Sequence, residues 1–240
     1  MEKGDMKYKG IQYTLCAIIL LTIFGLCARG QFPDSTLAGI QDLEDLNNLK
    51  FSFMSVQNDE DAAYERREQQ SAVEQNLAYA YAFTAESTGA YQTSGTDGLQ
   101  EVTVLQVLRG DTAIEGQKVW IDEAVPGFEW SDRKVYIDGV TSFMQPGETY
   151  LIACNPYGKT TLQEVPECSA YYETDCYYGY LNLTRSQGSQ KLFQENQTYT
   201  MQDLRNTEFI ASSEEVLAAR QETKEKILQK YLSEIQEITR

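Results

Sequence analysis

The stretch Glu101-Val-Thr-Val-Leu-Gln-Val-Leu-Arg-Gly-Asp111 has the residue pattern of a β-strand, in which successive side chains point to opposite faces. It ends in a Gly-Asp turn. Apolar residues occur at both alternating sets of positions, which is typical of a strand inside a small barrel or sandwich. We expect one face to carry Val102, Val104, Gln106 and Leu108, and the other Glu101, Thr103, Leu105 and Val107.

Similar strand patterns, separated by turn residues, recur through the middle of the chain. Residues 89–98 are rich in Gly, Ser and Asp, and they predict a turn region before the central strand. The sequence therefore predicts a mainly β fold with helical flanks. The other expected strands are 78–84, 118–122, 134–138 and 148–154, with shorter candidates at 162–165 and 179–183.

Three strings in this region, at residues 102–110, 119–121 and 144–154, resemble the core pattern of netrin-type and tissue-inhibitor-of-metalloproteinase-like domains. They also resemble exported proteins of Gram-positive bacteria that share the same arrangement. The resemblance implies a small, OB-like five-stranded barrel. The chain has no Cys-x-Cys sequence with which such inhibitors chelate a protease zinc, so metalloproteinase inhibition is not carried over.

Composition narrows the possible functions. The chain has 20 Lys and Arg against 36 Asp and Glu, a formal net charge of -16, and such a surface repels the phosphates of nucleic acids. It has no histidine, which excludes Ser-His-Asp and Cys-His nucleophile systems and His-based metal sites. We therefore predict that the chain has no nucleic-acid partner, no cofactor and no metal site, and we assign no catalytic residue.

The N-terminal segment, residues 1–30, has the pattern of an export signal. Lysines precede an apolar run from Leu15 to Ala28, so we expect residues 11–28 to enter the membrane with the N-terminus in the cytoplasm. Three outcomes remain open: cleavage before Gln31, lipidation at Cys27, or an uncleaved single-pass anchor. Each places the rest of the chain at the extracytoplasmic face of the membrane or outside the cell.

The remaining chain divides into three parts on composition. Residues 31–76 form an acidic spacer with a short helix, residues 77–205 form the β-barrel domain, and residues 206–240 form an amphipathic helix. This last helix begins at a capping box, 212–215, and we expect it either to pack on the barrel or to associate with a second copy through residues 227–238. Its apolar stripe is Leu217, Leu228, Tyr231, Leu232, Ile235 and Ile238.

The cysteines outside the export signal allow several disulfide states. Cys168 and Cys176 could close a short loop while Cys154 stays a buried thiol, or Cys154 could pair with either of them. Aromatic residues crowd the same region, and exposed tyrosines beside carboxylates suit stacking on sugars or holding a cation. The candidate ligand-binding residues are Tyr171, Tyr172, Tyr177, Tyr178, Tyr180 and Trp130; the alternative is that alternate tyrosines pack on the barrel.

These features favour a non-catalytic binding or interaction module that contacts a protein or glycan at the cell surface. One alternative is a carboxylate-based hydrolase acting on cell-wall or other glycans. Another is a structural subunit that assembles through the C-terminal helix. The carboxylates considered for the hydrolase are Asp122, Glu123, Glu129, Asp132 and Asp138.

The export signal makes a prediction about processing. If the segment is cleaved, fractionation of whole cells followed by N-terminal sequencing should find a mature protein that starts at Gln31 in the medium. An uncleaved anchor or a lipidated Cys27 should instead keep the protein in the membrane fraction. Finding the protein in the cytoplasm would contradict export altogether.

Overall fold

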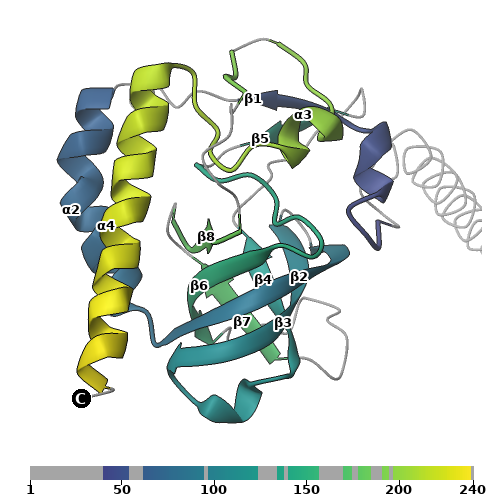
Figure 1. The fold of residues 1–240 in the computed structure, drawn as a ribbon. Helices are drawn as coiled ribbons and strands as arrows, with labels where there is room; N and C mark the ends of the chain where they lie inside the picture. The colour runs from purple at the N-terminus through teal and green to yellow at the C-terminus, as the bar shows by residue number, and fades with distance from the viewer. Residues whose placement is uncertain are drawn as a thin grey trace, which may run out of the picture. The chain divides into compact units, whose positions relative to one another are not determined.

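Strand β3 (Asp97–Arg109) lies between β2 (Tyr81–Ser94) and β4 (Lys118–Glu123) in a computed structural model of the chain (Figure 1). The residues described are 40–53, 62–94, 97–123, 134–137, 140–156, 170–174, 178–184, 191–194 and 197–238. The segment predicted to be an export signal, residues 1–30, and the strand expected at 162–165 lie outside these residues.

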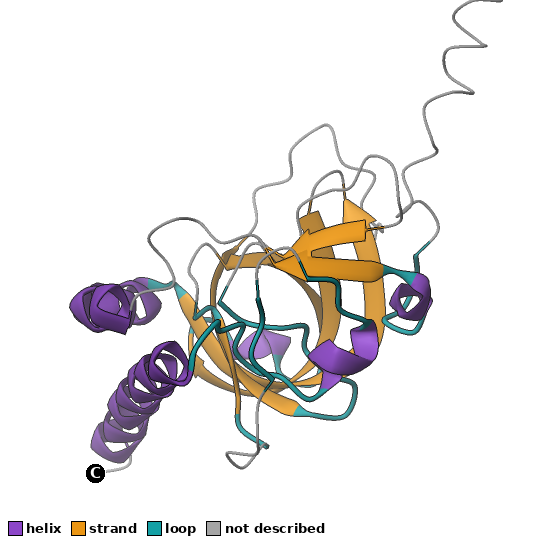
Figure 2. Cartoon of the chain, turned by 90° about the horizontal axis from the view of Figure 1, so that it is seen from above, coloured by secondary structure: helices purple, strands orange, loops and turns teal. Residues whose placement is uncertain are grey.

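Five strands close into a ring. The order is β2-β3-β4-β7-β6, with β7 (Ala170–Thr174) and β6 (Thr149–Pro156), and β6 pairs back with β2. Figure 2 shows this ring end-on. Within the ring, β4 and β7 run parallel and the other described pairs are antiparallel. A sixth strand, β8 (Tyr180–Asn182), pairs with β6 at Tyr150–Ile152, on the same edge that β7 pairs with at Asn155 and Pro156. The mainly β class is confirmed.

The other elements that the structure describes are a small second sheet, three short helical turns and two long helices. Strand β1 (Lys50–Phe53) pairs in parallel with β5 (Lys134–Ile137) as a separate two-stranded sheet. Short helical turns are η1 (Asp45–Asn48), η2 (Thr112–Ile114) and α3 (Met201–Arg205). Two long helices, α2 (Ala62–Ala78) and α4 (Glu214–Ile238), lie side by side (Figure 1).

Alternation along the strands builds two apolar clusters. Phe83 and Ile152 point into the ring and belong to its inner core, where both are fully buried. Their neighbours Ala82 and Leu151 point outward and pack under α2 and α4. The helices therefore cover one outer face of the ring, and each side of β2 and β6 contributes to a core.

The expected alternation along the central strand holds only at its start. Val102 and Val104 face the inner core, but Val107 then packs there while Leu108 packs under the helices. The pairing with β2 skips Leu105 and Leu108, so two β-bulges shift the side-chain pattern. Leu105 is thereby turned to solvent, with 48% of its surface exposed. Bulges of this kind leave no clear signal in the sequence.

The prediction of a turn region at residues 89–98 is wrong for most of its length, because β2 continues to Ser94 and β3 begins at Asp97. Gly89 takes a φ of 88° within the strand, at a break in its register with β3, and pairing then resumes at Tyr91. A Cβ on Gly89 would lie 2.9 Å from Pro146 Cγ, so this glycine permits a close approach as well as an unusual backbone angle.

Two further segments differ from the sequence-based division. Residues 40–53, expected to be part of a spacer, bury Leu43, Leu46 and Phe51 and belong to the compact unit Gly39–Arg240. Strand β7 lies where the sequence suggested a tyrosine-rich loop. Among the described residues, the structure contains no helix with the length and apolarity needed to cross a membrane.

Gly110 offers a test of the turn that ends β3. Its φ is 108°, and a Cβ would overlap the Tyr81 ring, so Gly110→Ala should destabilise the fold by about 3 kcal/mol or more. Gly116→Ala is the matched control, because its φ is 75° but its surroundings are open; a loss of about 1 kcal/mol is expected. Urea unfolding measures both, and equal losses would contradict the role of Tyr81.

Candidate functional site

Helix α2 presents polar groups to the protein interior. Its sequence is rich in Glu, Gln, Arg and Ala, which favour a helix, but of its most buried residues only Val73 is apolar. The others are Glu65, Gln69 and Asn76, which recur at helical spacing along the face toward α4. Polar groups buried in this way need hydrogen-bond partners, and α4 and the residues before β8 supply them.

The centre of this interface is a buried ion pair. Arg220 of α4 places Nε and Nη2 each 2.7 Å from Glu65 Oε1. The hydroxyl of Tyr178, just before β8, donates to Glu65 Oε2 at 3.2 Å. Burial is the main cause that raises the pKa of the Tyr178 phenol, and the nearby Glu65 charge adds to it, so the phenol stays a neutral donor.

Hydrogen bonds on both sides of this pair extend the connection. Gln69 Nε2 donates to Thr223 Oγ1 at 3.2 Å, and Gln69 Oε1 accepts from Lys226. Asn76 Nδ2 donates to the Tyr178 carbonyl at 2.7 Å, and the Tyr231 hydroxyl donates to the Asn76 carbonyl at 3.1 Å. Tyr178 is therefore held by α2 at two points.

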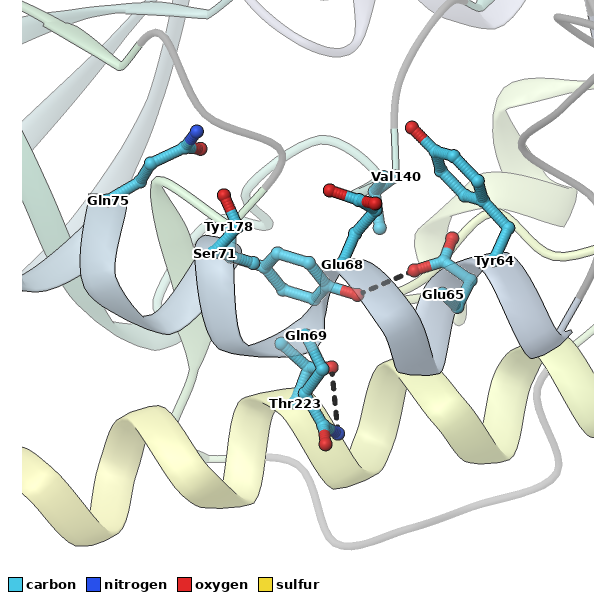
Figure 3. Close-up of a pocket in the computed structure, with 10 residues that line it drawn as sticks. Tyr64, Glu65, Glu68, Gln69, Ser71, Gln75, Val140, Tyr178 and Thr223 are labelled. Atoms are coloured by element: carbon cyan, nitrogen blue, oxygen red, sulfur yellow. Dashed lines mark hydrogen bonds between the residues drawn. The ribbon is translucent and has the colours of Figure 1, made fainter.

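A hollow of about 180 Å³ opens beside this interface. Figure 3 shows the side chains of Tyr64, Glu68, Ser71 and Gln75 rising from α2 on the side away from α4. Ala72, a small residue of the same helix, also lines the space. Val140 and Tyr178 line it from outside the helix, while Glu65, Gln69 and Thr223 connect it to the buried interface.

The side chains that line the hollow are mostly polar, and its ionised groups are acidic. Its lining includes two carboxylates, two phenols, two hydroxyls and two amides, and it includes no Lys or Arg. A cation does approach the rim: the guanidinium of Arg67 lies 5.0 Å from the centre of the Tyr64 ring. Its Nε is 3.4 Å from Glu68 Oε1. The hollow therefore offers a ligand both donors and acceptors, together with negative charge.

No protein-family model, curated protein or solved structure matches this chain.

The predicted tyrosine site is divided by the structure. Tyr178 and Tyr180 are 3% and 4% exposed, so neither offers a ring face to a sugar in this conformation. Tyr180 instead packs on Tyr150 in the inner core, which fits the packing alternative. Tyr171 and Tyr172 lie on β7, whose side chains are not described. The remaining candidates, Tyr177, Trp130, Cys168 and Cys176, lie outside the described residues.

The structure describes Cys154 and two of the five carboxylates considered for a hydrolase. Cys154 is a free, fully buried thiol in the inner core, and burial raises its pKa, which makes it unreactive. Asp122 and Glu123 lie on β4, whereas Glu129, Asp132 and Asp138 fall outside the described residues. Within the described part of the chain, no group of His, Cys, Asp or Glu residues is arranged to hold a metal ion.

The predicted C-terminal helix is confirmed as α4, which begins at Glu214. The Ser213 hydroxyl accepts from the Val216 amide at 3.2 Å and caps its first turn. The cap is therefore Ser213, one residue later than the capping box expected at 212–215 implies. Ile227 and Tyr231 of α4 are buried in the outer apolar cluster, so in this fold they are not available for self-association. Leu232 of the same helix is 58% exposed. Side chains beyond Leu232 on this helix are not described.

A second buried ion pair fixes α4 to the sheet. Lys224 Nζ lies 2.8 Å from both carboxylate oxygens of Glu208 and 2.6 Å from the Asn182 carbonyl of β8. Glu208 Oε1 also accepts from the Asn182 amide at 2.9 Å. All three donors of the lysine are used in this way, so Lys224 is a structural group.

A second hollow, wider at about 670 Å³, lies against η1. It is lined by Asp42, Glu44, Glu148 and Arg205, so both charge signs are present. Arg205 Nη2 donates to Asn47 Oδ1 of η1 at 3.2 Å. This mixed lining gives no preference for one class of ligand, and the α2 hollow is the stronger candidate site.

Sequence reasoning missed the α2 hollow. A short helix within residues 31–76 is predicted, but its sparse apolar positions indicate only a helix packed along an edge of the domain, with no role for its polar residues. A signal was present: Tyr64, Glu68, Ser71 and Gln75 recur at helical spacing beside the stripe that contains Glu65 and Gln69.

The buried ion pair can be tested by removing one member. Glu65→Gln leaves Arg220 buried without its counter-charge, so it should lower the free energy of unfolding by about 3 kcal/mol. Glu222→Gln removes the partner of Arg66 in a pair that is 51% exposed on both sides, and should cost under about 0.5 kcal/mol. Urea unfolding compares them, and similar losses would contradict the central role of Glu65.

Proposed function

We propose that this chain is a non-catalytic binding module that acts at the extracytoplasmic face of the membrane or outside the cell. Its partner is a protein or glycan at the cell surface, and the α2 hollow is the contact site. The export signal in residues 1–30 supports the location. The net negative charge of the chain supports a partner other than a nucleic acid, because phosphates would be repelled.

The scaffold that we propose is an OB-like barrel. An OB-fold is a five-stranded Greek-key barrel in which the first strand closes the ring and the third and fifth strands run parallel. The order β2-β3-β4-β7-β6, the return pairing of β6 with β2, and the parallel β4–β7 pair support this assignment. The strings that resemble netrin-type domains fall on β3, β4 and β6, three strands of the ring.

One observation supports the binding role above the others. The floor of the hollow is rigidly held, because Glu65 and Tyr178 are fixed by the buried interface. Its rim residues Ser71 and Gln75 are exposed to solvent and contribute nothing to the core. A pre-organised floor beneath an accessible polar rim is the arrangement expected of a binding site.

Photo-crosslinking on intact cells tests this proposal. A photo-crosslinking amino acid in place of Ser71 should capture a surface protein or glycan, and the adduct should be lost when Tyr64→Ala is added. The matched control is the same amino acid in place of Thr112, an exposed residue of η2 that does not line the hollow. Protease sensitivity of the captured partner separates protein from glycan.

Three outcomes would contradict the binding proposal. Equal capture from both positions would mean that contact is not specific to the hollow. A crosslinked dimer of this chain would favour the structural-subunit alternative. Release of soluble sugars from cell-wall glycans by the purified protein, abolished by a carboxylate substitution, would favour the hydrolase.

A further inference from the structure

We infer that the α2 hollow binds the guanidinium head of an arginine side chain supplied by a partner protein. This inference rests on the proposed binding function and specifies its ligand. It depends on three features of the described residues: an internal guanidinium at the rim, the charge balance of the lining, and the directions of its acceptors.

The first feature is Arg67, which already makes at the rim the contacts expected of the ligand. Its guanidinium lies 5.0 Å from the centre of the Tyr64 ring, within the range of a cation–π interaction. Its Nε lies 3.4 Å from Glu68 Oε1. The Arg67 side chain is 70% exposed, so these contacts are weak and open to exchange. A partner arginine would take over Tyr64 and Glu68 and displace Arg67 into solvent.

The second feature is the charge of the lining. Glu65 and Glu68 both line the hollow. The charge of Glu65 is balanced by Arg220, which is buried at 2% side-chain exposure on the α4 side. Glu68 faces the open side with 47% side-chain exposure, and the cation near it is the exposed Arg67. The negative charge that a ligand meets is therefore that of Glu68.

The third feature is the geometry of the acceptors. Glu68, Ser71 and Gln75 project from successive turns of α2 along one side of the hollow (Figure 3). Tyr64 adds an aromatic face at the end of this row. A guanidinium is planar and has five N–H donors in a fixed fork, so it can stack on Tyr64 while bonding Glu68. An ammonium is a compact point charge that would use the carboxylate but not the ring plane.

Titration with methylguanidinium chloride, followed by amide NMR of the full chain in a nonionic detergent, tests the inference. The backbone amides of residues 64–75 should shift, and the shifts should diminish as salt is raised. Sodium acetate, which lacks donors and carries the opposite charge, should leave them unmoved. N-acetylglucosamine serves as the neutral sugar probe.

Paired variants make the test specific to the hollow. Glu68→Gln should weaken methylguanidinium binding about tenfold, because a charge-assisted hydrogen bond is lost. Glu74→Gln makes the same change on the same helix at an exposed residue outside the hollow, and should leave affinity within about twofold. Arg67→Ala should strengthen binding about threefold by removing the internal competitor, whereas Arg66→Ala should not.

The outcomes separate this inference from the proposed function. Equal weakening by Glu68→Gln and Glu74→Gln would show general charge attraction and overturn it, as would no gain from Arg67→Ala. If N-acetylglucosamine shifts these amides while methylguanidinium does not, and Ser71 still crosslinks, the site stands but its ligand is a glycan. If neither probe binds and Ser71 captures nothing, both the inference and the proposed function fall.

Discussion

The Glu65–Arg220 ion pair is the interaction on which the helical half of the structure depends. It joins α2 to α4, and the Tyr178 hydroxyl attaches both to the segment that leads into β8. A buried ion pair adds little net stability, because desolvation offsets most of the attraction, but it strongly penalises arrangements that leave one charge alone. Here the pair joins the mostly polar buried face of α2 to α4.

The ring imposes a second constraint on the same region. Strand β2 pairs with both β3 and β6, so its outward residues are committed to the cluster beneath α2 and α4. Bulges at Leu105 and Leu108 allow β3 to serve the inner core with Val107 and the outer cluster with Leu108. Because the cores share strands, the position of the helices, and with it the hollow, follows from closure of the ring.

The hollow combines rigidity below with accessibility above. Glu65, Gln69 and Tyr178 are engaged with other parts of the fold, whereas Ser71 and Gln75 face solvent. In a strongly acidic chain, a carboxylate at the rim is unremarkable by itself. What distinguishes Glu68 is that the exposed guanidinium of Arg67 contacts both its carboxylate and the Tyr64 ring.

The sequence by itself determined the mainly β class, the C-terminal helix and most strands of the ring, because alternation and helix capping are local patterns. It placed Cys154 in an apolar strand but left open whether this residue is a buried thiol or pairs with Cys168 or Cys176. Only the tertiary structure decided that β2 runs through Gly89, that Tyr178 and Tyr180 are interior, and that Glu65 meets Arg220. Those outcomes depend on contacts between residues far apart in the chain, and a polar helix face carries no local sign of which distant partner will satisfy it.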